Sequence, residues 1–194
     1  GTAMVMTPIM AAPLWLVGAP KKWFKWGGIV GLLAIAGFTL AHPYRMQRFA
    51  SFLRPNQDLG GINFQVHQGL WALGTGGWSG LGPGASRQKW GSLPEAHTDF
   101  IYAVLGEEMG LVGTLLTLGL FAALVFTAVR IARHSNDRFV QLVSFGIATW
   151  IATQVAVNIG AVLRLAPVTG VPLPLVSYGG SSLIPTLLGI GILM

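Results

Sequence analysis

The sequence predicts an all-helical protein that crosses a membrane several times. Hydrophobic residues make up 53% of the 194 residues and charged residues only 9%, whereas roughly a quarter of the residues of a soluble domain are charged. So few charges cannot cover the surface of a soluble globular protein. Long apolar runs also alternate with loops that are basic or contain Pro and Gly, which is typical of a polytopic membrane protein.

The apolar runs predict about five transmembrane helices, since a spanning helix needs about 20 apolar residues. They cover approximately residues 3–18, 27–41, 100–129, 139–163 and 181–194. The second run is short, but Trp23, Phe24 and Trp26 can lie in the interfacial aromatic belt and lengthen it. Because the chain starts at Gly1 and stops at Met194 inside an apolar run, we expect a fragment, 1–194, of a single membrane domain with both terminal spans cut short.

Two short basic loops predict which ends of the helices face the cytoplasm. Three lysines lie within 21–25 and three arginines within 130–138, and short loops rich in Lys and Arg stay on the cytoplasmic side. The segments 42–98 and 164–180 are then extracytoplasmic loops, the first of them large. These outer segments carry as many basic residues, so charge alone leaves the orientation open, and loop length supports it in part.

The formal net charge of +6 suits contact with anionic membrane lipid or with a phosphorylated substrate. The basic residues are scattered rather than gathered in a nucleic-acid-binding block, so we expect no nucleic acid partner. Arg45, Arg48 and Lys89 are candidates to bind a diphosphate, with snorkelling to headgroups as the alternative for the two arginines. The chain has no cysteine and its four histidines are dispersed, which predicts no structural metal site.

A cluster of titratable residues closes the long outer loop. Glu95, His97 and Asp99 lie directly before the apolar run that begins at Phe100. In a chain with only six acidic residues, such a cluster at a membrane edge indicates a functional site. Asp99 is the candidate general base. The alternative is a structural role in which Thr98 or Asp99 caps the following helix.

Glu107 and Glu108 lie about two helical turns further along. At about 100° per residue they point to different sides of the helix, so they cannot do the same work. Glu107 is predicted to line a substrate cavity or to pair with an arginine, since a carboxylate at membrane depth needs a cavity or a partner. Gly106 and Gly110 form a small-xxx-small pair, which favours close helix packing.

Two glycine-bearing segments have structural and functional interpretations. The run LGTGGWSGLGPG, Leu73 to Gly84, has neither a preceding strand nor a following Gly-Lys-Ser/Thr, so it predicts a chain of turns, or backbone that approaches a substrate, rather than a nucleotide loop. The run PLPLVSYGGSS predicts a bent outer segment that ends in a helix N-terminus. There Ser181 or Ser182 is the N-cap, or the free N–H groups bind an anion; the candidate substrate contacts are Ser177, Gly179 and Ser181.

The blocks LPEAHTDFIYAVLGEEMGLVG and TGVPLPLVSYGGSS resemble the SEDS family of bacterial cell-wall proteins, the shape, elongation, division and sporulation group. GTAMVM, HPYRMQR and INFQVHQGLWALGTGGWSGLG are also similar to family sequence in order and spacing, so the resemblance covers nearly the whole chain. Family members have ten spanning helices, and the resemblance implies their C-terminal half. Ala96 favours the FtsW and SpoVE branches over the RodA branch, and Thr169 stands where some members carry Lys.

The resemblance implies an inverting glycosyltransferase of cell division that polymerises lipid II at the outer face of the bacterial inner membrane and releases undecaprenyl diphosphate. Asp99 matches the family's proposed catalytic carboxylate, which takes the proton from the 4-hydroxyl of the acceptor sugar. Glu95 and His97 would then orient the substrate or tune that carboxylate, and Thr98 would contact the substrate. The implied partners are a class B penicillin-binding protein, which is a transpeptidase, and other divisome or elongasome membrane proteins. The sequence leaves open whether a divalent cation, Mg²⁺ or Mn²⁺, helps the leaving group.

Two other functions fit the same sequence. The first is a lipid II transporter, or flippase, in which the outer loops gate a path that passes Glu107 or Glu108. The second is a scaffold without enzymatic activity that positions a transpeptidase.

Overall fold

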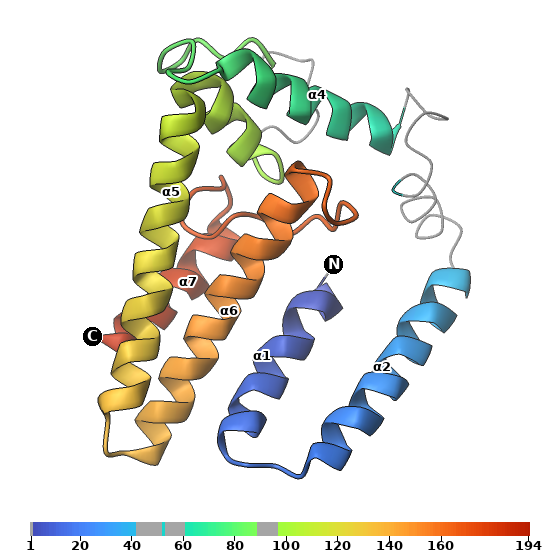
Figure 1. Cartoon of the computed structure of the whole chain (residues 1–194), viewed down its shortest axis with the longest axis vertical. Coiled ribbons are helices and arrows are strands. Elements are labelled where there is room, and N and C mark those ends of the chain that lie inside the picture. Colours follow the sequence, from blue (N-terminus) through green and yellow to red (C-terminus); the bar gives the residue numbers. More distant parts are fainter. Residues whose placement is uncertain (1, 42–51, 53–60, 89–96) are drawn as a thin grey trace.

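The structure, a computed structural model, describes residues 2–41, 52, 61–88 and 97–194. Within these residues it is helical and contains no strand, as predicted. The helices, labelled as in Figure 1, are α1 (Thr2–Leu16), α2 (Lys21–Ala41), α4 (Ile62–Gly76), α5 (Ile101–His134), α6 (Arg138–Val162) and α7 (Gly180–Leu193). Of these, α5 and α6 are long and apolar enough to cross a membrane.

Four of the helices agree closely with the predicted apolar runs. The helices α1, α6 and α7 begin and end within two residues of the predicted limits. The helix α2 begins earlier than its apolar run, at Lys21, and so includes Trp23, Phe24 and Trp26. These aromatic residues lengthen the helix, as the sequence predicted.

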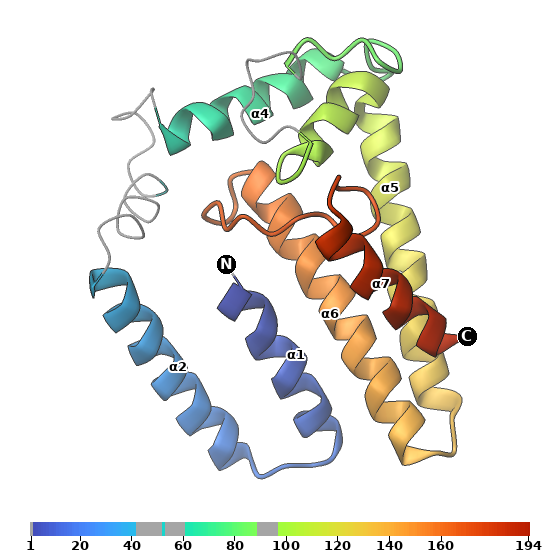
Figure 2. The ribbon, with the colours of Figure 1, turned by 180° about the vertical axis from the view of Figure 1, so that it is seen from behind.

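The helices form a bundle with two distinct ends (Figure 1). The helix α6 packs against α5 on one side and α1 on the other, and α7 packs against α6 on the face seen in Figure 2. At one end, here called the α4 end, α4 lies across α5, and the segments 77–88, 97–100 and 163–179 gather nearby. The loops 17–20 and 135–137 both lie at the opposite end, here called the basic-loop end. The prediction that both basic loops face the cytoplasm requires them to lie at the same end of the bundle, as they do. The side of the membrane that each end faces stays a prediction.

The predicted span of residues 100–129 is wrong in one respect, because α5 is not one straight helix. Gly110 has φ 66° and ψ −162°, which are not helical angles. The hydroxyl of Tyr102 donates to the carbonyl oxygen of Thr114 at 3.3 Å, whereas twelve residues of straight helix would separate them by about 18 Å. The chain therefore folds back at Gly110, and residues 101–109 form a short helix that leans on the long part of α5 (Figure 1).

The hydrophobic core lies beneath the α4 end. It joins one helix face from α4, the beginning of α5, the last turns of α6 and the segment 168–173; its members include Ala72, Phe100, Ala103, Ile151, Val162 and Leu173. Towards the basic-loop end, many large apolar side chains of α5 are exposed instead, as expected where helices face lipid. The best-packed part of the molecule is thus the part that carries the motif blocks.

Candidate active site

The segment 97–99 is fixed by hydrogen bonds to each of its carbonyl oxygens. The backbone N–H of Tyr178 donates to His97 at 2.9 Å, the hydroxyl of Ser177 donates to Thr98 at 2.6 Å, and the amide of Asn158 donates to Asp99 at 3.0 Å. The donors come from α6 and from the segment that precedes α7. The two motif blocks, far apart in sequence, therefore meet at Asp99.

The segment 171–177 is itself held to α6. The amide of Asn158 also donates to the carbonyl oxygen of Val171 at 2.7 Å, and the amide of Gln154, one turn earlier, donates to Pro172 at 3.0 Å. Ser177 closes a turn by accepting from the N–H of Leu173 at 2.7 Å. Gln154 and Asn158, on one face of α6, thus hold the segment 171–177, and Asn158 also holds the segment 97–99.

The capping role considered for Thr98 and Asp99 is not what the structure has. The helix α5 begins at Ile101, and its N-cap residue is Phe100, whose side chain makes no capping hydrogen bond. Phe100 is 1% exposed, so apolar burial anchors the helix start. Asp99 lies just before the N-cap and is partly exposed, next to the packed core.

Glu107 holds a neighbouring loop. Its side chain is 1% exposed and accepts hydrogen bonds from the hydroxyl of Ser86 at 2.5 Å, from the N–H of Arg87 at 3.2 Å and from the N–H of Gln88 at 3.3 Å. The predicted partner of Glu107 was an arginine side chain or a cavity. The structure instead uses both carboxylate oxygens to fix the backbone of 86–88, the last described residues before 97.

Glycines let the turn after α4 interlock with the break in α5. The N–H groups of Leu81 and Gly82 donate to the backbone carbonyl oxygens of Glu107 and Glu108, both at 3.0 Å, and the N–H of Leu111 donates back to the carbonyl oxygen of Gly77 at 2.9 Å. A Cβ placed on Gly110 would lie 2.6 Å from the carbonyl oxygen of Trp78. The chain of turns predicted over 73–84 is wrong for 73–76, which form the last turn of α4. Turns and bends occupy 77–84, and their backbone closely approaches that of 107–112. The close helix packing predicted for Gly106 and Gly110 is present at Gly106, which lies against α4, whereas Gly110 breaks the helix and contacts the turn at Trp78 and Gly80.

The second predicted cap is likewise corrected. The N-cap of α7 is Gly179, which has no side chain to cap with, and the hydroxyl of Ser182 donates to the carbonyl oxygen of Gly179 at 3.0 Å. Neither Ser181 nor Ser182 is therefore the N-cap. Ser177, a predicted substrate contact, is buried and serves to hold Thr98.

The structure brings together only some of the predicted site residues. His97, Thr98, Asp99 and Ser177 meet in one place, and Gly179 lies next to them in the chain. Four candidates, Arg45, Arg48, Lys89 and Glu95, lie outside the described residues. Among the described residues, no three His, Asp or Glu side chains come close enough to form a metal site.

Sequence reasoning missed Gln154 and Asn158, which order the site from α6. Both are polar residues inside an apolar run, four positions apart and hence on one face of a helix. Polar side chains at such positions in a spanning helix are costly unless they are used. That spacing was the available signal.

The fold and the site define the class of protein: an all-helical polytopic membrane protein with a polar site at one end of its helices. Residues 1–194 match the family model of the FtsW, RodA and SpoVE cell cycle proteins, and the chain belongs to this family.

Relatives support the same conclusion. Stage V sporulation protein E of Bacillus subtilis is 44% identical over 194 residues, 100% of this chain and 53% of that protein. A probable peptidoglycan glycosyltransferase FtsW of Aliivibrio salmonicida is 46% identical over 187 residues, 95% of this chain and 47% of that protein. The chain thus spans about half the length of these curated relatives.

A solved structure has the same fold. It belongs to work on the structural coordination of polymerization and crosslinking by a peptidoglycan synthase complex. The TM-score is 0.74 at 30% sequence identity, and the match covers 100% of this chain and 54% of the solved one.

Proposed function

We propose that the chain is the C-terminal half of a peptidoglycan glycosyltransferase that polymerises lipid II, with Asp99 as general base. The observation that carries this proposal is the fixation of all three carbonyl oxygens of 97–99 by α6 and by the segment before α7. A backbone held in this way gives the side chain of Asp99 a fixed point of attachment, and orientation of reacting groups is a large part of catalysis. The FtsW relatives carry the name of this activity.

The reaction follows from the position of Asp99. Its carboxylate takes the proton from the 4-hydroxyl of the acceptor sugar as that oxygen attacks the anomeric carbon of the donor. The bond between the anomeric carbon and the diphosphate oxygen breaks, undecaprenyl diphosphate leaves with the electron pair, and the configuration inverts. Glu107 does not reach the substrate in this scheme, because its carboxylate is occupied by residues 86–88.

Location and partners form part of the proposal. The α4 end faces the outside of the bacterial cytoplasmic membrane, where lipid II presents its sugars, and the basic loops 17–25 and 130–138 face the cytoplasm. A class B penicillin-binding protein crosslinks the product. The fold neighbour from a peptidoglycan synthase complex supports such an assembly.

The test is Asp99→Asn in the full-length protein, supplied with labelled lipid II and its transpeptidase partner. Loss of a positioned base lowers rates by roughly 10² to 10⁴-fold, so we expect glycan polymerisation to fall by that factor while the helical content is unchanged. Asp137→Asn is the matched control, because Asp137 is a carboxylate at the basic-loop end that caps α6, and asparagine caps equally well. Undiminished polymerisation by Asp99→Asn would exclude the base role.

A further inference from the structure

Arg164 has a backbone conformation that a side chain disfavours. It follows the end of α6 with φ 59°, in the left-handed region. Among the non-glycine residues described, only Arg164 and Leu175 have a positive φ. Glycine is the usual residue at such a helix end, because a Cβ is strained there. Local backbone preference therefore does not account for an arginine at this position.

The guanidinium of Arg164 carries a charge, and one of its nitrogen atoms has no hydrogen-bond partner. Its Nη2 atom is buried and has no hydrogen bond, and the hydroxyl of Thr169, five residues on, is in the same condition. The other buried polar atoms without a partner in the described part of the chain are side-chain amide oxygens, which are neutral: those of Gln68, Gln88, Gln154 and Asn158. A desolvated cationic nitrogen without an acceptor is far more costly than these.

No carboxylate of the described residues supplies that acceptor. None of them accepts a hydrogen bond from Nη2 of Arg164, Glu107 is engaged with 86–88, and Asp137 caps α6 at the basic-loop end. The side chain of Arg164 is also only partly buried. An anion from outside the chain can therefore reach it.

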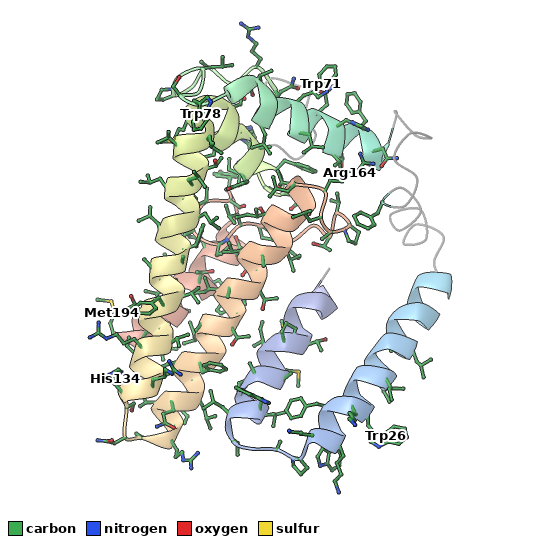
Figure 3. All side chains as sticks on the ribbon, in the orientation of Figure 1. Trp26, Trp71, Trp78, His134, Arg164 and Met194 are labelled. Carbon is green, nitrogen blue, oxygen red and sulfur yellow. The ribbon has the colours of Figure 1, made fainter. Side chains whose placement is uncertain are left out.

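The position of Arg164 suits a group that lies near Asp99. Figure 3 shows Arg164 at the α4 end, between the tip of α6 and α4. Asn158, which binds the carbonyl oxygen of Asp99, lies in the last turns of α6, and Arg164 directly follows the C-cap of that helix, Leu163. Arg164 and the segment 97–99 therefore lie at the same end of the bundle.

We propose that Arg164, with the hydroxyl of Thr169, binds a phosphate group of a membrane-anchored lipid. Guanidinium groups match phosphate oxygens in geometry as well as charge, and a threonine hydroxyl adds a neutral donor. The phosphate belongs either to a phospholipid headgroup or to the diphosphate of a polyprenyl-linked substrate. The second source rests on the proposed function, whereas the phosphate site itself does not.

Binding to the full-length protein in dodecyl maltoside, a detergent without phosphate, tests this site. Native mass spectrometry would titrate undecaprenyl diphosphate and, separately, phosphatidylglycerol. We expect Arg164→Gly to weaken one of the two by roughly tenfold or more, and Thr169→Val to weaken the same one by a smaller factor. Loss for the diphosphate alone assigns the substrate, and loss for phosphatidylglycerol alone assigns the headgroup. Equal binding of both probes by the wild-type protein and Arg164→Gly would overturn the proposal.

The thermal midpoint shows whether a loss of binding is specific. Arg164→Gly should raise the midpoint, because glycine accepts φ 59° without strain; a variant that fails to fold would lower it. Leu175→Gly is the backbone control, since Leu175 has φ 64° and no charge. It should raise the midpoint and leave phosphate binding unchanged. Arg133→Ala removes a cation at the basic-loop end and should also leave binding unchanged.

Asp99→Asn separates this proposal from the proposed function. It should keep the affinity for undecaprenyl diphosphate and lose polymerisation. If Asp99→Asn polymerises normally while Arg164→Gly still loses the phosphate ligand, the base role fails and the phosphate site stands.

Discussion

The two ends of the bundle are held together by different kinds of interaction. At the α4 end, side-chain hydrogen bonds join residues that are 21, 59 and 79 positions apart, from Ser86, Asn158 and Ser177. At the basic-loop end, the side-chain hydrogen bonds given by the described residues are local: that of Thr127 spans four residues and that of Gln141 spans six. Long-range polar contacts therefore concentrate where the motif blocks meet.

The hydrophobic core is also unevenly distributed between the two ends. Leu120, Phe126 and Phe139, towards the basic-loop end, are 65%, 68% and 72% exposed, while the hydrophobic core gathers beneath the α4 end. Lipid can cover exposed apolar side chains but cannot satisfy a backbone that leaves the helix. The helices towards the basic-loop end thus form a scaffold. The irregular backbone of the α4 end is stabilised by hydrogen bonds from side chains and from neighbouring backbone.

Among substitutions that test this difference between the two ends, Gly110→Ala is expected to lower the free energy of unfolding most. The φ and ψ of Gly110, 66° and −162°, lie in a region essentially restricted to glycine, and a Cβ would collide with the backbone of Trp78 and Gly80. Loss of the fold-back at Gly110 should cost about 3 kcal/mol or more of unfolding free energy. Denaturation of the purified protein in detergent measures this cost.

Gly119→Ala is the matched control in the same helix. Gly119 is helical and a Cβ there would meet nothing within 4 Å. Alanine stabilises a helix interior by about 0.5–1 kcal/mol relative to glycine, so this variant should unfold slightly later than the wild-type protein. If both variants behave alike, the break at Gly110 has no special place in the fold.

The scaffold could be predicted from the sequence and much of the irregular end could not. Apolar runs predicted the helices around residues 3–18, 139–163 and 181–194 to within two residues, because a helix that spans a membrane is a continuous run of apolar residues. The fold-back at Gly110 was missed, because GEEMG continues an apolar run and the reason for the break lies in Gly77 and Gly80, which contact it from another segment. The helix α4 was missed as well, since it lies inside a loop by hydropathy.

The site was also predicted only in part, because some of its features depend on contacts between segments that are far apart in the sequence. Asp99 and Ser177 belong to motif blocks, and the structure brings these blocks together. The caps assigned to Thr98 or Asp99 and to Ser181 or Ser182 were wrong, because tertiary contacts shift both helix starts to Phe100 and Gly179. A buried ring and close backbone contacts replaced the local polar caps that sequence alone favours.

A smaller effect is expected from Glu107→Gln. The amide keeps one acceptor oxygen and turns an NH₂ group towards donors among Ser86, Arg87 and Gln88, which the carboxylate now satisfies. Leaving buried donors unpaired should cost about 2–3 kcal/mol. Asp137→Asn, the corresponding change at the basic-loop end, should cost close to nothing, because asparagine also accepts from the N–H of Phe139. Equal losses of thermal stability in the two variants would contradict the contrast between the ends.

The smallest and most local effect is expected from Ser177→Ala. The hydroxyl, which belongs to a buried residue, donates to the carbonyl oxygen of partly buried Thr98 and accepts from the N–H of buried Leu173, so its loss should cost about 1–2 kcal/mol. Thr127→Ala removes an exposed hydroxyl that bonds within its own helix, and should be neutral. The informative readout is kinetic: if Ser177 positions Asp99 through Thr98, kcat for lipid II polymerisation falls more than KM rises, because the base is displaced while the bound sugars keep their contacts. A rise in KM at unchanged kcat would mean instead that Ser177 contributes to substrate binding. Ser177 would then not position Asp99.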